Sequence, residues 1–124
     1  MLTNILFDLD GTLTDPKEGI VRCVCYALKQ LGQPLRSELE LINLIGLSLH
    51  FIFQQLLNSG DNNLIEKAIS LYRDRFSKVG LFINEVYPGI TELLALLHKN
   101  SYKPYVVTLK PKVYAERIVR HFSL

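Results

Sequence analysis

The sequence predicts an α/β fold in which several helices are inserted between two parallel strands of one layer. Residues 5–7 and residues 105–107 are apolar runs short enough for buried strands. Between them, apolar residues recur every three or four positions, which is typical of helices. A strand, a helical crossover and a parallel strand make a βαβ unit. We therefore expect a partial α/β core made of residues 1–14 and 84–124, and a helical unit made of residues 15–83.

Two carboxylates directly follow the first predicted strand. Asp8 and Asp10 would lie at its carboxyl end, where open α/β sheets bind ligands, and Gly11 allows a tight turn after them. Such a pair repels unless a cation or a shared proton compensates it. One carboxylate could act as a nucleophile and the other as proton donor and acceptor, with Mg²⁺ holding the pair and a phosphate together. The alternatives are an acidic turn without a site and a calcium loop, whose glycine would stand in a different place.

The middle of the chain carries four predicted helices and no strand. The first helix begins near Pro16, with Asp15 as its cap, and ends at Gly32. A second capping box at Ser37 opens a short helix that runs to about residue 45, where Gly46 breaks it. Successive helices without a strand indicate a small bundle. The remaining two helices are predicted over residues 48–57 and 63–79.

The chain returns to the α/β layer after Gly89, with a helix predicted over residues 90–100 and the second strand over residues 105–107. A last helix is expected to begin at Pro111. Thr108 and Lys110 lie between that strand and that helix, so a hydroxyl, free backbone amides and an ammonium group meet at a helix N-terminus. This combination favours a bound phosphate. The alternative is an ordinary polar loop between a strand and a helix.

Composition and charge exclude several classes of protein. The net charge is +2 and no basic stripe carries interleaved aromatic residues, so we expect no nucleic-acid partner. Residues 41–60 lack formal charge but hold too many amide and hydroxyl groups for a membrane span. Asp8 and Asp10 interrupt any signal-peptide core. Cys23 and Cys25 would point in different directions on a helix, which indicates reduced thiols and a cytoplasmic protein.

The residues from Asp8 to Thr12 resemble motif I of the haloacid dehalogenase-like superfamily, Asp-x-Asp-Gly-Thr after an apolar strand. Thr108 resembles the hydroxyl residue of motif II, and residues 16–80 resemble the helical cap inserted between these motifs. The resemblance covers the whole chain and implies an incomplete Rossmann-like core of parallel strands. It also implies that Asp8 forms an aspartyl-phosphate, and that Asp10 protonates the leaving group and then activates water. Mg²⁺ would bind the Asp8 carboxylate and the Asp10 main-chain carbonyl.

The resemblance also implies a phosphate-binding set and a substrate-facing part of the cap. Leu109 departs from the superfamily pattern, in which Ser or Asn often stands beside the motif II threonine, so only its backbone amide could serve. Gly46 and Ser48 lie in a cap loop that can face the substrate; the alternative is a turn between helices. The implied phosphate-binding residues are Gly11, Thr12, Thr108, Leu109 and Lys110.

Two further stretches, residues 45–49 and 80–90, resemble the phosphoglycolate phosphatase-like branch, which also includes pyrophosphatases and nucleotidases. We therefore expect a Mg²⁺-dependent phosphomonoester hydrolase that acts on a small phosphorylated metabolite. Dehalogenation is not expected, because the dehalogenases of the superfamily lack a carboxylate in the place of Asp10.

The superfamily's third motif, a lysine, and its fourth, an acidic pair, have no counterpart in these residues. We therefore interpret the chain as the truncated first part of a phosphatase, with weak or no turnover alone. One alternative is a non-catalytic remnant that binds a partner, or a second copy of itself, through its unfinished sheet. The other is a phosphotransferase, such as a sugar-phosphate mutase, which would share the chemistry of Asp8 and Asp10.

Overall fold

The computed structural model describes residues 1–124, and its chain forms two compact units. One unit combines Met1–Pro16 with Phe82–Leu124, and the other comprises Lys17–Leu81. The first unit contains strands and helices, and the second contains helices almost throughout. The predicted α/β class with parallel strands is confirmed.

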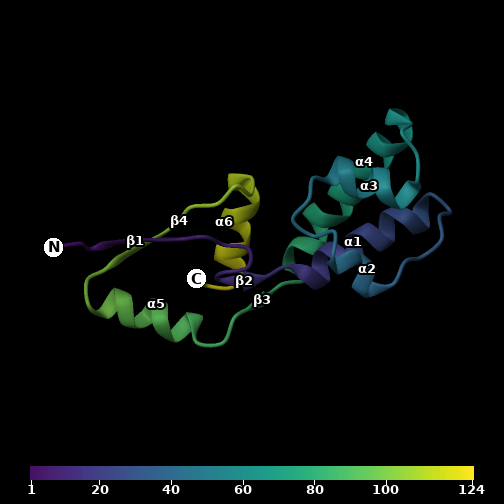
Figure 1. Cartoon of the computed structure of the whole chain (residues 1–124). Helices are drawn as coiled ribbons and strands as arrows, with labels where there is room; N and C mark the ends of the chain where they lie inside the picture. Colours follow the sequence, from purple (N-terminus) through teal and green to yellow (C-terminus); the bar gives the residue numbers. More distant parts are fainter. The chain divides into compact units, whose positions relative to one another are not determined.

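The sheet of the first unit is a parallel pair of strands, β1 (Asn4–Phe7) and β4 (Lys103–Val106) (Figure 1). Leu6 stands opposite Tyr105, and the N–H of Val107 donates to the Phe7 carbonyl at 2.8 Å. Parallel strands present their carboxyl ends at the same edge. The residues that follow Phe7 and those that follow Val106 are therefore neighbours, although most of the chain separates them.

A second pair of strands was not predicted. β2 (Thr14–Asp15) runs antiparallel to β3 (Glu85–Val86). Each strand has two residues, too few to show the alternation by which strands are predicted. Asp15 lies in β2, and the first helix begins at Lys17, one residue later than predicted.

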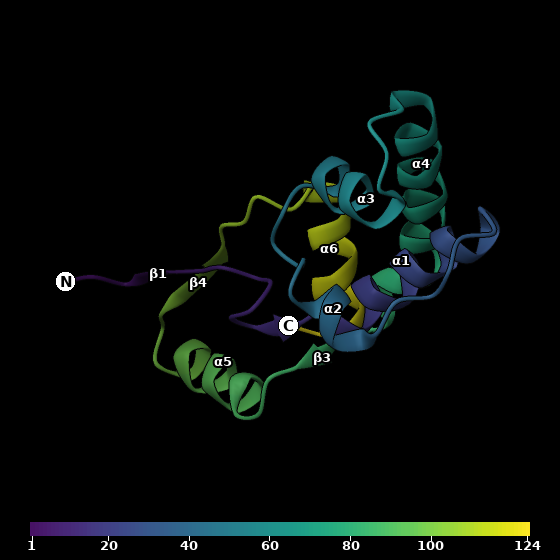
Figure 2. The same cartoon turned by 45° about the vertical axis from the view of Figure 1, so that its right-hand side comes forward.

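Two helices complete the first unit: α5 (Ile90–Lys99), which packs against β4, and α6 (Lys112–His121) (Figure 2). The buried side chains of this unit come from residues 9–16 and from α6, while β4 and α5 have no fully buried residue. Leu6 is 67% exposed and Tyr105 48% exposed, so this sheet leaves apolar surface uncovered. The buried apolar residues are Leu9, Leu13, Ala115 and Ile118.

The second unit is the helical bundle that the apolar periodicity predicted. It consists of α1 (Lys17–Gln30), α2 (Glu38–Ile42), α3 (Leu49–Leu57) and α4 (Asn62–Lys78), and α4 packs against both α1 and α3. A 3₁₀ helix (Gly80–Phe82) follows α4. The Ser37 side chain caps α2, which ends three residues earlier than predicted. No helix has both the length and the apolar character needed to cross a bilayer.

The core of this bundle is built from one face of each long helix. Phe53 of α3 meets Tyr72 of α4 edge to face, with ring centroids 6.3 Å apart, and Tyr72 stacks on Phe76 at 5.6 Å. The other fully buried members are Cys23, Val24, Ala27, Leu28, Ile52, Leu56, Ile65, Ala68 and Ile69.

Candidate active site

Asp8 is the first residue beyond β1, and its side chain is exposed. Its Oδ1 accepts a hydrogen bond from the N–H of Leu9 at 2.8 Å. This bond occupies one oxygen of the carboxylate and fixes the orientation of the group. The other oxygen, Oδ2, is left for a ligand.

In the loop after Asp8, several backbone hydrogen bonds converge on one carbonyl group. The Leu9 carbonyl accepts hydrogen bonds from three N–H groups, at 3.2, 2.9 and 3.2 Å, which belong to Thr12, Leu13 and Thr14. The N–H of Gly11 donates to the Thr14 carbonyl at 2.8 Å, and Gly11 has a φ of 82°, a conformation that glycine adopts without strain. The buried side chains of Leu9 and Leu13 anchor the loop from within. Asp10 is thereby held on a rigid turn.

Thr108, Leu109 and Lys110 lie beyond β4, at the same edge as Asp8. The Thr108 Oγ1 accepts a hydrogen bond from the N–H of Lys110 at 3.1 Å, so its hydroxyl proton stays available to a ligand. Leu109 has a fully exposed side chain. Helix α6 begins at Lys112, one residue later than predicted, and no side chain caps its N-terminus.

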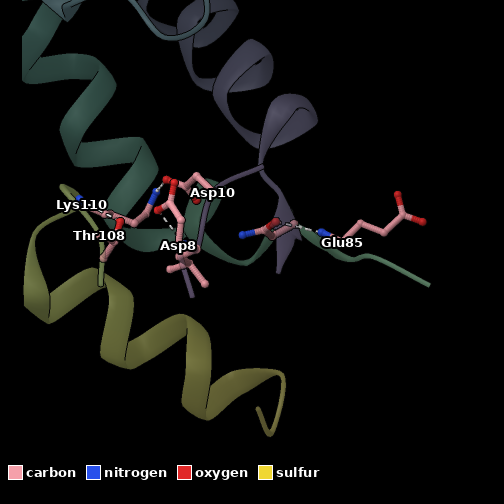
Figure 3. A network of polar contacts seen from close by, with 7 residues as sticks. Asp8, Asp10, Glu85, Thr108 and Lys110 are labelled. Carbon is pink, nitrogen blue, oxygen red and sulfur yellow. Dashed lines mark hydrogen bonds and ion pairs between the residues drawn. The ribbon is translucent and has the colours of Figure 1, made fainter. Parts of the chain in front are cut away.

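The structure joins the two loops through one ion pair, between the Lys110 Nζ and the Asp10 Oδ2 at 2.9 Å. The Lys110 side chain is 9% exposed and that of Asp10 is 34% exposed, so the pair is largely shielded from water. In Figure 3 the side chains of Asp8, Asp10, Thr108 and Lys110 gather at one place. The sequence predicted these four residues as candidates, but it did not predict that Lys110 pairs with Asp10.

The two cap candidates have local structural roles. The Ser48 side chain caps α3 and accepts the N–H of Phe51 at 3.2 Å. Gly46 has a φ of 99° in the turn that precedes this helix. These observations favour the interpretation of a turn between helices, and substrate contact by Gly46 and Ser48 stays a prediction.

A hollow of about 560 Å³ lies beside Thr108 and Lys110, on the surface of α6. Two cationic side chains that the sequence analysis did not single out, Lys112 and Arg120, line it. Glu116 faces the same hollow, and its Oε1 lies 3.7 Å from the Lys112 Nζ. A basic residue on the last turn of a helix is common, so Arg120 alone gave no signal. The remaining lining residues are Val106, Ala115 and Val119.

Asp8 and Asp10 are the side chains at this edge that suit a metal ion. Mg²⁺ prefers oxygen ligands and is commonly held by one or two carboxylates together with substrate phosphate and water. No cluster of three or more acidic, histidine or cysteine side chains is present, and Glu85 points away from the gathered residues (Figure 3). The Asp8 carboxylate is exposed at this edge, where an ion and water can reach it. The donor set therefore fits Mg²⁺ as a partial site that a phosphate would complete.

The comparison with protein families agrees with this geometry. A family model described as haloacid dehalogenase-like hydrolase matches residues 5–124. The chain belongs to this family. The match includes both loops of the candidate site and the helical unit between them.

Several known proteins resemble the chain over most of its length. A 5'-nucleotidase of Pseudomonas aeruginosa is 47% identical over 122 residues, which are 97% of this chain and 54% of that protein. The tyrosine-protein kinase PtkA of Mycobacterium tuberculosis is 36% identical over 97% of this chain and 40% of its own length. A phosphoglycolate phosphatase of Nitrosococcus oceani is 31% identical over 86% of this chain and 49% of its own length.

A solved structure supports the fold in the same way. The haloacid dehalogenase-like hydrolase of Streptococcus pneumoniae superposes with a TM-score of 0.84 at 30% identity, over 98% of this chain and 56% of that protein. The chain thus spans about half the length of the relatives that it matches.

Proposed function

We propose that this chain carries the nucleophile and the phosphate loop of a Mg²⁺-dependent phosphomonoester hydrolase. The observation that carries the proposal is the meeting of Asp8, Asp10, Thr108 and Lys110 at the carboxyl ends of two parallel strands (Figure 3). Two carboxylates, a hydroxyl and an ammonium group are the groups that covalent phosphoryl transfer requires.

In the proposed first step, the Asp8 Oδ2 attacks the phosphorus atom in line with the leaving-group oxygen. Its Oδ1 is already occupied by the N–H of Leu9 at 2.8 Å, which supports this assignment of the two oxygens. The bond from phosphorus to the leaving oxygen breaks, and Asp10 donates a proton to that oxygen. The products are an aspartyl-phosphate on Asp8 and a free alcohol.

In the second step, Asp10 removes a proton from water, whose oxygen attacks the phosphorus atom. The bond between Asp8 and phosphorus breaks, inorganic phosphate leaves, and both carboxylates return to their starting forms. The same residue therefore serves as acid and then as base. The Lys110 ammonium lies 2.9 Å from the Asp10 Oδ2 and brings positive charge beside the proposed acid and base.

The phosphoryl oxygens would be held by groups from both loops. The Thr108 hydroxyl would donate to one oxygen, and the backbone amides of Gly11, Thr12 and Leu109 would donate to others. Lys110, which is paired with Asp10, would add positive charge beside the phosphoryl group. Mg²⁺, held by the Asp8 carboxylate and the Asp10 main-chain carbonyl, would neutralise charge on the phosphoryl group.

The substrate class that fits best is a small phosphorylated metabolite. The hollow beside Thr108 has room for such a molecule, and Lys112 and Arg120 make it net positive. The relatives named 5'-nucleotidase and phosphoglycolate phosphatase favour a nucleotide or 2-phosphoglycolate. The two cysteines are unpaired, which is consistent with a cytoplasmic protein.

The test is phosphate release by the purified chain with and without Mg²⁺, on a panel that includes 2-phosphoglycolate and several 5'-nucleotides. We expect weak turnover that Asp8→Asn abolishes and that chelation of Mg²⁺ abolishes as well. Glu85→Gln is the matched control, because that carboxylate points away from the site (Figure 3). Turnover that survives Asp8→Asn would refute the proposed nucleophile.

A second candidate is phosphoryl transfer to an acceptor other than water. The observation that favours it is the 36% identity to PtkA, a relative named as a tyrosine-protein kinase. Transfer shares the first step on Asp8 and differs in the acceptor of the second. Appearance of label from a phosphorylated donor on an added sugar phosphate or tyrosine peptide, instead of in inorganic phosphate, would favour this candidate.

A third candidate is a non-catalytic role in which the chain binds a second copy of itself or another protein. The uncovered apolar side chains of the β1–β4 sheet, including Leu6 and Tyr105, favour it. Sedimentation over a range of concentrations distinguishes it. A monomer that stays monodisperse at high concentration would count against it.

A further inference from the structure

Two buried oxygen atoms have no hydrogen-bond partner in the protein, the Asp10 Oδ1 and the Thr14 Oγ1. Thr14 is fully buried. A polar atom that leaves water without a replacement hydrogen bond is unfavourable, and most such atoms in proteins have a partner or bind an ordered water. Each of these two oxygens therefore favours a hydrogen bond to a bound water or ligand.

The two residues are also neighbours in the backbone. Asp10 and Thr14 form an isolated parallel bridge, closed by the bond from the Gly11 N–H to the Thr14 carbonyl at 2.8 Å and by the bond from the Thr14 N–H to the Leu9 carbonyl at 3.2 Å. The two oxygens without a protein partner therefore belong to residues that the same short turn holds side by side.

The other oxygen of Asp10 is already engaged. The Asp10 Oδ2 accepts from the Lys110 Nζ at 2.9 Å. The carboxylate thus has an outer oxygen, which faces Lys110, and an inner oxygen, which is buried without a partner in the protein. A group that binds the inner oxygen would set the rotation of the whole carboxylate.

We propose that one internal water molecule bridges the Thr14 Oγ1 and the Asp10 Oδ1, and that Thr14 is thereby a positioning residue for Asp10. The water donates a hydrogen bond to the Asp10 Oδ1 and accepts a hydrogen bond from the Thr14 hydroxyl, so both buried oxygens gain a partner. Neither Thr14 nor the water changes its protonation. The outer oxygen, the Asp10 Oδ2, is the atom that exchanges the proton in each step; this last assignment rests on the proposed function.

The first experiment detects the bound water and measures what the Thr14 hydroxyl contributes to stability. In the wild-type chain we expect a cross-peak between a long-lived water and the Thr14 side chain in rotating-frame Overhauser spectra. Thr14→Val keeps the shape and removes the hydroxyl, so we expect it to lose this cross-peak, to lower the urea midpoint and to shift the ¹³C resonance of the Asp10 carboxyl. Thr91→Val, at an exposed position in α5, is the control and leaves all three unchanged.

The sign of the midpoint change is decisive. If the Thr14 hydroxyl were merely buried without a partner, its replacement by a methyl group would raise the urea midpoint. A raised midpoint without a water cross-peak in the wild type would overturn the proposal. Thr14→Ser retains the hydroxyl and keeps the cross-peak, so it serves if Thr14→Val does not fold.

Where turnover is measurable, Thr14→Val lowers kcat roughly tenfold with KM unchanged, a fraction of what a positioned acid and base supplies. Thr14→Ser recovers most of that loss. A chain without any Asp8-dependent turnover would refute the proposed function, while the water cross-peak and the urea midpoint would still decide the role of Thr14.

Discussion

The Lys110 Nζ lies 2.9 Å from the Asp10 Oδ2, although the two residues are 100 positions apart in the chain. This pair connects the loop after β1 with the loop after β4 and places a cation beside the proposed acid and base. Lys110 is 9% exposed, so its ammonium group meets the Asp10 carboxylate where water has little access. Loss of either partner leaves a charge that water reaches poorly.

Lys110→Met is therefore expected to lower the free energy of unfolding by about 1–3 kcal/mol, less than for a fully buried pair because Asp10 is partly exposed. Urea denaturation at neutral pH measures the change. Lys112→Met is the control: its side chain is 90% exposed, so the expected change is within about 0.5 kcal/mol. Equal losses in the two variants would contradict a stabilising pair.

Asp10→Asn is expected to reduce phosphate release by about 10²–10⁴-fold, since an amide can neither protonate the leaving group nor accept a proton from water. In this variant, the rate of the first step should fall least with a substrate whose leaving group needs no proton. A nitrophenyl phosphate should therefore retain more of its rate of acylphosphate formation than an alkyl phosphate does. A uniform loss with both substrates would argue that Asp10 acts only through the fold.

Gly80→Ala is expected to destabilise the helical unit by about 1–3 kcal/mol, because overpacking forces neighbours to move. A Cβ at this position would overlap the Cys23 Sγ and lie 3.1 Å from the Phe76 ring. Gly60→Ala is the matched control, since nothing lies within 4 Å of its added carbon, and a small gain in stability is expected there. The double variant Gly80→Ala with Cys23→Ala should lose less than the sum of the single changes.

The stability of the helical unit is expected to fall at alkaline pH. Burial raises the pKa of the Cys23 thiol from 9.0 to about 11, against a smaller opposing effect of Arg75. The unfolded chain therefore loses the thiol proton at lower pH than the folded chain does. The stabilisation is complete below about pH 9 and is lost as the pH rises toward 11.

Urea midpoints across this range would check the prediction for Cys23. Cys23→Ala should flatten the pH dependence, whatever it does to stability at neutral pH. Cys25→Ala is the comparison at the other, less buried thiol. A slope that persists unchanged in Cys23→Ala would assign the pH effect to other groups.

Most of what could be predicted from the sequence came from patterns of residues that are adjacent or regularly spaced in the chain. The run from Asp8 to Thr12 needs no tertiary information, because its carboxylates, its glycine and its strand are adjacent in the chain. The helical unit could be predicted because each long helix shows its buried face as a periodic stripe. The two parallel strands were recognisable from short apolar runs, with errors of one or two residues at their ends.

Contacts between distant side chains could not be predicted. The partner of Lys110 depends on the register of β1 against β4, which brings two loops together and which no local pattern encodes. The strands β2 and β3 are too short for alternation to appear. The burial of Thr14 was equally hidden, because it lies in a strand of two residues that shows no alternation.

The pairing of β1 with β4 also sets the order in which the molecule can fold. Contacts within α1, α3 and α4 close only short stretches of chain, so they can form fast. Pairing of β1 with β4 requires closure of nearly the whole sequence, and the chain loses that conformational entropy before the ladder contacts form. The helices can therefore form early, and Asp8 meets Thr108 only in the last long-range closure. During synthesis, a chain of this kind acquires its candidate catalytic groups as neighbours only after residue 110 has left the ribosome.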